Sequence, residues 1–355
     1  MRRYLYILLF IIQITLSIAV TYASELKIKT LTLGVFAYRP KAIIEERYQP
    51  LVDYLNTHLH QCRIELRVLE LDELETALTD KQLDFVFTNP RHYIVLRHNY
   101  QFNGAIATLI KRSASGEETQ QLGGVIFTRS SEYSINRLAD IKGHRIAIPG
   151  TKYMGGYQTQ AYELLQAGIK LPDDARLIEV GRHDKVINSV LSKEADIGFV
   201  RTEILENLSQ EGKLDLSRIK VLNRQKITNF PFISSTRLYP EWPFIALPHV
   251  EVRVTSRIAS ALLAINGQQI FIHNAGIAGF APPADYFPVE EIARALRLPP
   301  FDNIPDFTLH DIWKKHNKGI LILSFFLFTT LFLIIVLLRR NNTVLEQQTI
   351  IQQHA

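Results

Sequence analysis

The chain has 355 residues, of which 47% are hydrophobic and 21% are charged, and its formal net charge is +5. This length exceeds what one small core needs, so we expect two lobes of ordinary domain size. Lysine and arginine are spread along the sequence rather than gathered in a run, which argues against nucleic acid as a partner. The single cysteine, Cys62, excludes an intramolecular disulfide, and the sequence has no Cys/His cluster at metal-ligand spacing, so neither a metal nor a cofactor is expected.

The first element is an apolar segment within residues 1–23. It begins with Arg2 and Arg3, continues through YLYILLFIIQITLSIAV and ends at the small residues Thr21 and Ala23. This order is typical of a cleavable signal peptide, and an uncleaved anchor of the same orientation remains an alternative.

The next part of the sequence alternates between strand and helix patterns. The expected order is strand 31–38, helix 48–59, strand 63–71, helix 72–82 and strand 83–89. Strands joined through helices favour a mostly parallel sheet with right-handed crossovers.

A second unit of the same kind follows. Its expected elements are strand 143–149, helix 155–169 ended by Gly168, strand 175–181, helix 183–194 and strand 195–201. Strands at 123–130 and 218–225 flank this unit and are interpreted as crossings between two lobes. The fold class is therefore α/β, a two-lobed clamshell over 24–312, with lobe 1 at about 24–124 and 227–305 and lobe 2 at about 125–226.

The last element is an uncharged apolar run, Gly319–Leu338. At 1.5 Å per residue it spans about 30 Å, the thickness of a hydrocarbon core, so it is predicted to be a transmembrane helix. Trp313 lies where an interfacial aromatic anchor belongs, and Arg339 and Arg340 favour a cytoplasmic end. Residues 339–355 are predicted to be a cytoplasmic stub that begins a coiled coil.

In open α/β sheets a ligand lies beyond the carboxyl ends of the strands, here in the cleft between the lobes. The candidate ligand-binding residues follow strands in both lobes and are Tyr38, Asn89, Tyr93, Thr151, Tyr153, Gly155, Gly156, Tyr157, His183 and Arg201. Tyr and Asn offer polar handles, and ordinary packing is the alternative for each.

Four of these candidates favour an anion. Gly155 and Gly156 open a helix with free backbone N–H groups, and a tight turn is the alternative reason for the two glycines. Arg201 offers a planar fork for an oxyanion or carboxylate. His183 is expected to face the cleft or, alternatively, to be a surface loop residue, whereas Arg39 and Arg91 are expected to be solvated.

The sequence resembles a known family over roughly residues 30–300. The segments TNPRHYIV, LADIKGHRIAIPG, GGYQTQAYELLQAG, HDKVINSVLSKEADIGFVRTEILE and FAPPADYFPVEEIARALRLPPFD resemble, in order and spacing, the periplasmic phosphate/phosphonate-type binding proteins of type II clamshell fold. Members of that family have a Ser- and Thr-rich anion turn, and this chain has Thr151-Lys152-Tyr153-Met154-Gly155-Gly156-Tyr157 instead. The end segment and the helix after it are similar to the sensing regions of tetrathionate-sensor-like histidine kinases.

The resemblance implies a periplasmic domain, tethered to a bacterial inner membrane, that senses a small anionic solute for two-component-type signalling. The expected partners are a second copy of the chain and a cytoplasmic kinase or other effector. The alternative is a tethered binding component of an ABC-type uptake system. No catalytic residue is nominated, because the sequence lacks a G-x-S-x-G elbow, an H-E-x-x-H motif and a Walker loop.

Overall fold

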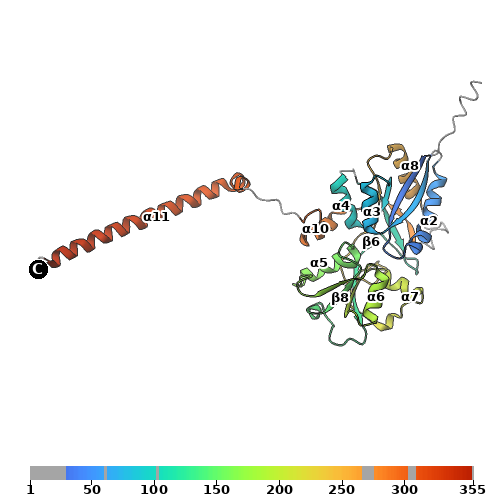
Figure 1. The fold of residues 1–355 in the computed structure, drawn as a ribbon, viewed down its shortest axis with the longest axis horizontal. Helices are drawn as coiled ribbons and strands as arrows, with labels where there is room; N and C mark the ends of the chain where they lie inside the picture. The colour runs from blue at the N-terminus through green and yellow to red at the C-terminus, as the bar shows by residue number, and fades with distance from the viewer. Residues whose placement is uncertain (1–28, 60–61, 101–103, 266–275, 303–308, 354–355) are drawn as a thin grey trace, which may run out of the picture. The chain divides into compact units, whose positions relative to one another are not determined.

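The computed structural model describes residues 29–59, 62–100, 104–265, 276–302 and 309–353, so the expected signal or anchor segment at 1–23 lies outside the described residues. The chain forms two compact units, Met1–Asp302 and Asn303–Ala355. The first unit contains both predicted lobes (Figure 1).

Lobe 1 is built on a mixed sheet with the order β14–β4–β13–β3–β1–β2, and β5 pairs with β4. Its strands are β1 (Lys29–Phe36), β2 (Cys62–Leu69), β3 (Phe85–Phe87), β4 (Ala105–Arg112), β5 (Glu118–Thr119), β13 (Pro243–Ala246) and β14 (Ile277–Ala281). β1 pairs in parallel with β2 and β3, as predicted, but β13, β4 and β14 pair antiparallel. The expectation of a mostly parallel sheet therefore holds only for the βαβαβ part of lobe 1. The segment that returns from lobe 2 adds β13 and β14, which run in the opposite direction.

The helices of lobe 1 are α2 (Lys41–Thr57), α3 (Leu71–Thr79), α4 (Pro90–Tyr100), α8 (Val252–Ala264) and α10 (Phe287–Ala295). α2 begins after Pro40, well before the predicted start at Tyr48, and it accommodates Pro50 within its length. α3 begins with a capping box, in which the Glu70 backbone N–H donates to Glu73 Oε2 at 2.8 Å. α8 and α10 confirm that the chain returns to lobe 1 after lobe 2.

Lobe 2 is built on a five-stranded sheet with the order β11–β7–β10–β8–β9. Its strands are β7 (Gly124–Arg129), β8 (Arg145–Ile148), β9 (Arg176–Glu179), β10 (Ile197–Arg201) and β11 (Ile219–Leu222). β8, β9 and β10 are parallel, and β7 lies antiparallel between β10 and β11. Its longer helices are α5 (Thr159–Gln166), α6 (His183–Leu191) and α7 (Ile204–Gln210), and α5 is preceded by a π-helical turn at Met154–Gln158.

The lobes are joined by two crossings that pair with each other (Figure 1). β6 (Gln121–Leu122) lies antiparallel to β12 (Tyr239–Pro240) between the lobes. Thr236 still belongs to lobe 2, because its Oγ1 accepts a hydrogen bond from the Gly124 N–H at 2.9 Å. The second crossing therefore lies at 237–241 rather than at the expected boundary near 226.

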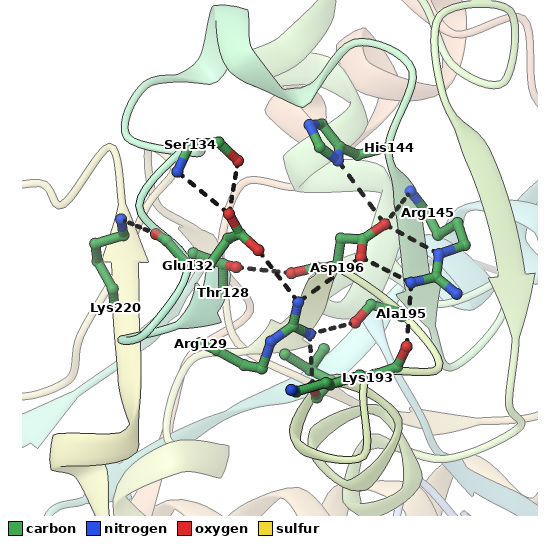
Figure 2. A network of polar contacts seen from close by, with 11 residues as sticks. Thr128, Arg129, Glu132, Ser134, His144, Arg145, Lys193, Ala195, Asp196 and Lys220 are labelled. Atoms are coloured by element: carbon green, nitrogen blue, oxygen red, sulfur yellow. Dashed lines mark hydrogen bonds and ion pairs between the residues drawn. The ribbon is translucent and has the colours of Figure 1, made fainter.

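At the amino ends of the parallel strands of lobe 2, polar side chains form a network around Asp196 (Figure 2). The Asp196 carboxylate accepts hydrogen bonds from Arg145 Nε at 3.0 Å and Nη2 at 2.8 Å. Arg129 Nη1 donates to the carbonyls of Val190 and Ala195 at 2.8 and 2.7 Å. These bonds connect β7, β8, α6 and the start of β10 at the end of the lobe away from the carboxyl ends of its parallel strands.

One cluster of buried apolar side chains continues from lobe 1 into lobe 2. It contains Leu33, Phe87 and Phe244 of lobe 1 together with Met154 and Val186 of lobe 2. The two lobes are therefore packed against each other, and burial of apolar surface contributes to the closed arrangement.

The second unit contains one long helix, α11 (Leu309–Gln353), with a local departure from helical geometry at His316. Within the described residues, the segment Ile312–Asn342 is long and apolar enough to cross a membrane, and its most apolar 18-residue window has a mean hydropathy of 3.0. It includes the whole predicted span Gly319–Leu338.

Candidate functional site

The carboxyl ends of the strands in both lobes bring aromatic side chains together. In lobe 1, Trp242 stacks on Phe36 with ring centroids 5.7 Å apart and meets Tyr38 edge-on at 5.1 Å. In lobe 2, Tyr153 meets Phe36 at 5.2 Å and His183 at 5.6 Å, both edge-on. The two lobes therefore share one aromatic wall.

Arg201, the last residue of β10, lies against this wall. Its guanidinium carbon is 5.8 Å from the ring centroids of both Tyr38 and Trp242, within the range of a cation–π contact. The side chain forms ion pairs with Glu203 at 3.2 Å and with Glu241. Arg201 is only 5% exposed, and its Nε has no hydrogen-bond partner among the residues that the structure describes.

Gly155 and Gly156 lie in the π-helical turn and allow close packing beside this arginine. A Cβ on Gly155 would lie 2.9 Å from Arg201 Cγ, and one on Gly156 would lie 2.4 Å from Pro149 Cγ and 2.7 Å from His183 Cε1. None of these three distances is tolerated between real atoms without movement. The two glycines are therefore required by the approach of Arg201 and His183, and π-helical turns of this kind occur frequently at functional sites.

A second group of charges lies beside Arg201. Glu203 Oε1 is 2.8 Å from Lys111 Nζ and 3.7 Å from Arg47 Nη1, both in lobe 1. Arg47 also donates to Tyr38 Oη at 2.5 Å. We call Arg47, Lys111 and Arg201 the cation cluster; the carboxylates it contacts are Glu203 and Glu241.

The pKa values of this group follow from burial and from its neighbours. Burial alone would lower the pKa of Arg201, but Glu241 and Glu203 hold it above its usual value. Burial would raise the pKa of Glu203, yet Lys111, Arg201 and Arg47 hold it well below its usual value. For Glu241 burial prevails, and its pKa is raised although Arg201 opposes the shift. The cluster thus keeps an excess of positive charge.

Two histidines near the cleft are buried and neutral. Burial, with Arg201 and Arg39 nearby, lowers the pKa of His183 to about 3. Burial, with Arg91 and Lys152 nearby, lowers the pKa of His92 to about 3. His183 is 2% exposed and begins α6, so the alternative of a surface loop residue is wrong.

Among the residues that the structure describes, several buried polar atoms at these strand ends have no hydrogen-bond partner. They are Asn89 Nδ2, His92 Nε2, His183 Nδ1 and Arg201 Nε. Unpartnered buried polar groups cost free energy, and such groups commonly mark a place that a ligand or water completes. Nitrogen atoms of this kind, next to excess positive charge, suit an anion.

Several ion pairs around the cleft join side chains of lobe 1 to side chains of lobe 2. Arg39 is fully buried and donates to Asp184 Oδ2 at 3.0 Å and to Glu211 Oε1 at 2.6 Å. In the opposite direction, Lys152 of lobe 2 contacts Asp72 of lobe 1 at 2.8 Å. The expectation that Arg39 is solvated is therefore wrong, and Arg91, at 5% exposure, is likewise buried.

Two pockets open between the lobes. One, of about 400 Å³, is lined by residues that include Arg47, Glu203, Asn207 and Glu211. The other, of about 300 Å³, is lined by residues that include Thr151, Lys152 and Tyr153 of lobe 2 and Glu70 and Asp72 of lobe 1.

The structure brings most of the predicted site residues together. Those that lie at the facing strand ends are Tyr38, Asn89, Thr151, Tyr153, Gly155, Gly156, His183 and Arg201. Tyr93 lies apart, because its ring packs on Tyr286 at 4.8 Å and its hydroxyl accepts from the Ala105 N–H. Tyr157 packs in the core of lobe 2.

Sequence reasoning missed four members of this group: Arg47, Lys111, Glu203 and Glu241. Lys111 carries a signal, since a lysine in the mostly apolar strand AIATLIKR is unusual in a sheet interior. Glu203 lies two residues beyond the predicted strand 195–201, and the burial of Glu203 and Glu241 depends on the packing of the two lobes.

Comparison with known proteins agrees with this architecture. The family model for the periplasmic substrate-binding protein of phosphonate ABC transporters matches residues 33–286. The tetrathionate sensor histidine kinase TtrS of Salmonella typhimurium is 28% identical over 273 residues, which cover 76% of this chain and 44% of the kinase. The chain thus spans less than half the length of that relative.

Solved structures share the fold. PhnD1 from Prochlorococcus marinus in complex with methylphosphonate has a TM-score of 0.62 and 18% identity, over 76% of this chain and 98% of that protein. A phosphonate transporter binding protein from Pseudomonas aeruginosa has a TM-score of 0.59 and 12% identity, over 82% and 94% of the two chains. At these identities the likeness establishes the type II clamshell fold.

Proposed function

This chain belongs to the family of periplasmic substrate-binding proteins of phosphonate ABC transporters, and from that premise we propose that it is the extracytoplasmic ligand-sensing part of a membrane receptor. The ligand is a small anion bound between the lobes. The observation that carries this proposal is Arg201: buried, held against Tyr38 and Trp242, and left with an unpartnered Nε beside excess positive charge.

The sensing role is supported by two features. The chain resembles a sensor histidine kinase over most of its own length, and that relative is a tetrathionate sensor. In addition, α11 continues without interruption from its apolar segment through residues 339–353, which suits the passage of a conformational change across a membrane. A cytoplasmic kinase or other effector then receives the signal, and the receptor acts as a homodimer in a bacterial inner membrane.

Binding is tested with the full chain in lipid nanodiscs. Isothermal titration with tetrathionate, sulfate, methylphosphonate and acetate measures which anions bind. Arg201→Lys keeps the charge but loses the planar fork, so the affinity for a bound oxyanion falls by about tenfold or more. Lys170→Arg, an exposed change in lobe 2, is the control and leaves affinity unchanged. Absence of binding by every anion would refute an anion-sensing role.

Signalling is tested by cross-linking near the outer end of α11. The native thiol Cys62 is first replaced by alanine, and Trp313→Cys then places one cysteine in each chain. We expect a disulfide between two chains whose yield changes when a binding anion is added. No cross-link in either condition would contradict a dimeric receptor.

The second candidate is a tethered binding component of an uptake system, favoured by the family match over residues 33–286. In that case α11 serves only as an anchor. Replacing residues 309–355 by a lipid anchor then preserves uptake of the anion, whereas a receptor loses its response.

A further inference from the structure

Glu203 occupies an unusual place in the cleft. Its side chain comes from lobe 2, yet Oε1 lies 2.8 Å from Lys111 Nζ and 3.7 Å from Arg47 Nη1 of lobe 1. Oε2 accepts from Arg201 Nη1 at 3.2 Å. One carboxylate therefore contacts every member of the cation cluster, which is the arrangement expected of a bound anion.

The backbone holds Glu203 in this position. Thr202 is fastened to the first crossing: its N–H donates to the Gly123 carbonyl and its Oγ1 accepts from the Gly123 N–H, both at 3.1 Å. Glu203 itself has a left-handed conformation, with φ of 79°, which a non-glycine residue rarely adopts. Asn207 Nδ2 adds a hydrogen bond to Oε1 at 2.9 Å. Unfavourable backbone geometry of this kind clusters at ligand sites and switch regions.

The carboxylate also borders open space. Glu203 and Arg47 both line the pocket of about 400 Å³ between the lobes, whereas Lys111 and Arg201 are buried and are not among its lining residues. An anion that enters from this pocket meets the negative charge of Glu203 before it reaches Lys111 or Arg201.

We propose that Glu203 is a specificity-determining residue of the cleft, a resident carboxylate that competes with the ligand for the cation cluster and disfavours doubly charged oxyanions relative to singly charged anions. The inference rests on the proposed function and concerns the same site.

The selection follows from charge balance. Three cations face the carboxylates Glu203 and Glu241, so a singly charged anion already balances the positive charge that remains. The unpartnered nitrogens of Arg201 and His183 are placed to receive either kind of anion, but a dianion brings a second negative charge next to Glu203, and the repulsion grows with the charge of the ligand. Removing the charge of Glu203 therefore favours dianions more than monoanions.

The test compares the full chain in nanodiscs with its variant Glu203→Gln at constant ionic strength. Titrations use sulfate and tetrathionate as dianions and nitrate and acetate as monoanions. We expect Glu203→Gln to raise the dianion-to-monoanion affinity ratio by about tenfold, as the loss of one close charge interaction predicts.

Glu211→Gln is the matched control. It also removes a carboxylate that joins the lobes and lines the same pocket, but its partner is Arg39 rather than the cation cluster. Its affinity ratio stays within about twofold of the wild type, because no charge next to Arg201 or Lys111 changes.

The outcomes separate the two proposals. If the wild type binds a dianion and Glu203→Gln leaves the ratio unchanged, the role of Glu203 is overturned while anion sensing stands. If no protein binds any of the four anions, anion sensing itself is overturned. Should Glu203→Gln not fold, the double variant Lys111→Gln/Glu203→Gln is compared with Lys111→Gln, because these two proteins differ only in the charge of Glu203. Equal affinity ratios in these two variants overturn the role of Glu203.

Discussion

Arg39 in lobe 1 and Asp184 in lobe 2 are 145 positions apart in the sequence, and their side chains meet in a two-point contact with N–O distances of 3.1 and 3.0 Å. The arginine lies just beyond the carboxyl end of β1, and the aspartate lies in the first turn of α6. A two-point contact of this kind fixes both the distance and the relative orientation of the two side chains. It therefore joins the lobes and also neutralises the buried guanidinium of Arg39.

Arg39→Ala removes this contact and leaves Asp184 and Glu211 without their partner. Because both carboxylates are partly exposed to solvent, we expect the lower part of the usual range for truncating a buried ion pair, about 2 kcal/mol of the free energy of unfolding. Urea denaturation of the full chain measures the change.

Lys170→Ala is the control for Arg39→Ala, since its ion pair with Asp173 is largely exposed and is expected to contribute less than about 1 kcal/mol. Equal effects of the two substitutions would contradict a structural role for the Arg39 contact.

Gly156→Ala places a methyl group 2.4 Å from Pro149 Cγ and 2.7 Å from His183 Cε1. The crowding shifts the π-helical turn and is expected to cost about 1–3 kcal/mol of stability and to weaken anion binding. Gly319→Ala, where a Cβ has no neighbour within 4 Å, serves as the comparison and leaves binding unchanged. A Gly156→Ala protein with wild-type affinity and stability would show that the turn adjusts freely.

His183 makes the stability of the cleft depend on pH. Its pKa is about 3 in the folded protein, below the usual value of 6.5, because of burial and the nearby Arg201 and Arg39. Between pH 6.5 and 3 the unfolded chain therefore binds more protons at this site, so stability falls as the pH is lowered through this window. In His183→Gln the decline between pH 7 and pH 5 should be shallower, as measured by thermal unfolding.

Asp196 also makes the stability of the protein depend on pH, in a lower pH range than His183. Hydrogen bonds from Arg145 prevail over burial and lower its pKa from 3.8 to about 2. Its contribution is therefore complete above pH 4 and is lost as the pH falls toward 2. Since part of the carboxylate is exposed, we expect about 1 kcal/mol at pH 7 between the wild type and Asp196→Asn, shrinking at acid pH. A difference that does not change with pH would contradict this account.

The sequence predicted the order of elements and much of the site because both follow local patterns. The apolar strands and amphipathic helices identified the two βαβαβ units, and the rule that ligands lie beyond strand ends selected Tyr38, His183 and Arg201. The apolar run Gly319–Leu338 was equally readable, since length and composition are sufficient for such a helix.

What the sequence did not predict depends on contacts between distant segments. Arg39 was expected to be solvated, because nothing near it in the sequence shows that Asp184 and Glu211 would enclose it. Glu203 was passed over for the same reason: its partners Lys111 and Arg47 belong to the other lobe. The antiparallel pairing of β13 and β14 in lobe 1 was likewise not predicted, because it depends on the return of the chain to lobe 1 through the second crossing.

The uninterrupted course of α11 beyond its apolar segment has a rotational consequence. Successive residues of an α-helix are turned by about 100°, so one residue inserted after Leu338 would rotate the face presented by residues 339–353 by that angle, and seven inserted residues would nearly restore it. If the activity of a cytoplasmic effector depends on which face of this helix is presented to it, that activity would rise and fall periodically with the number of inserted residues.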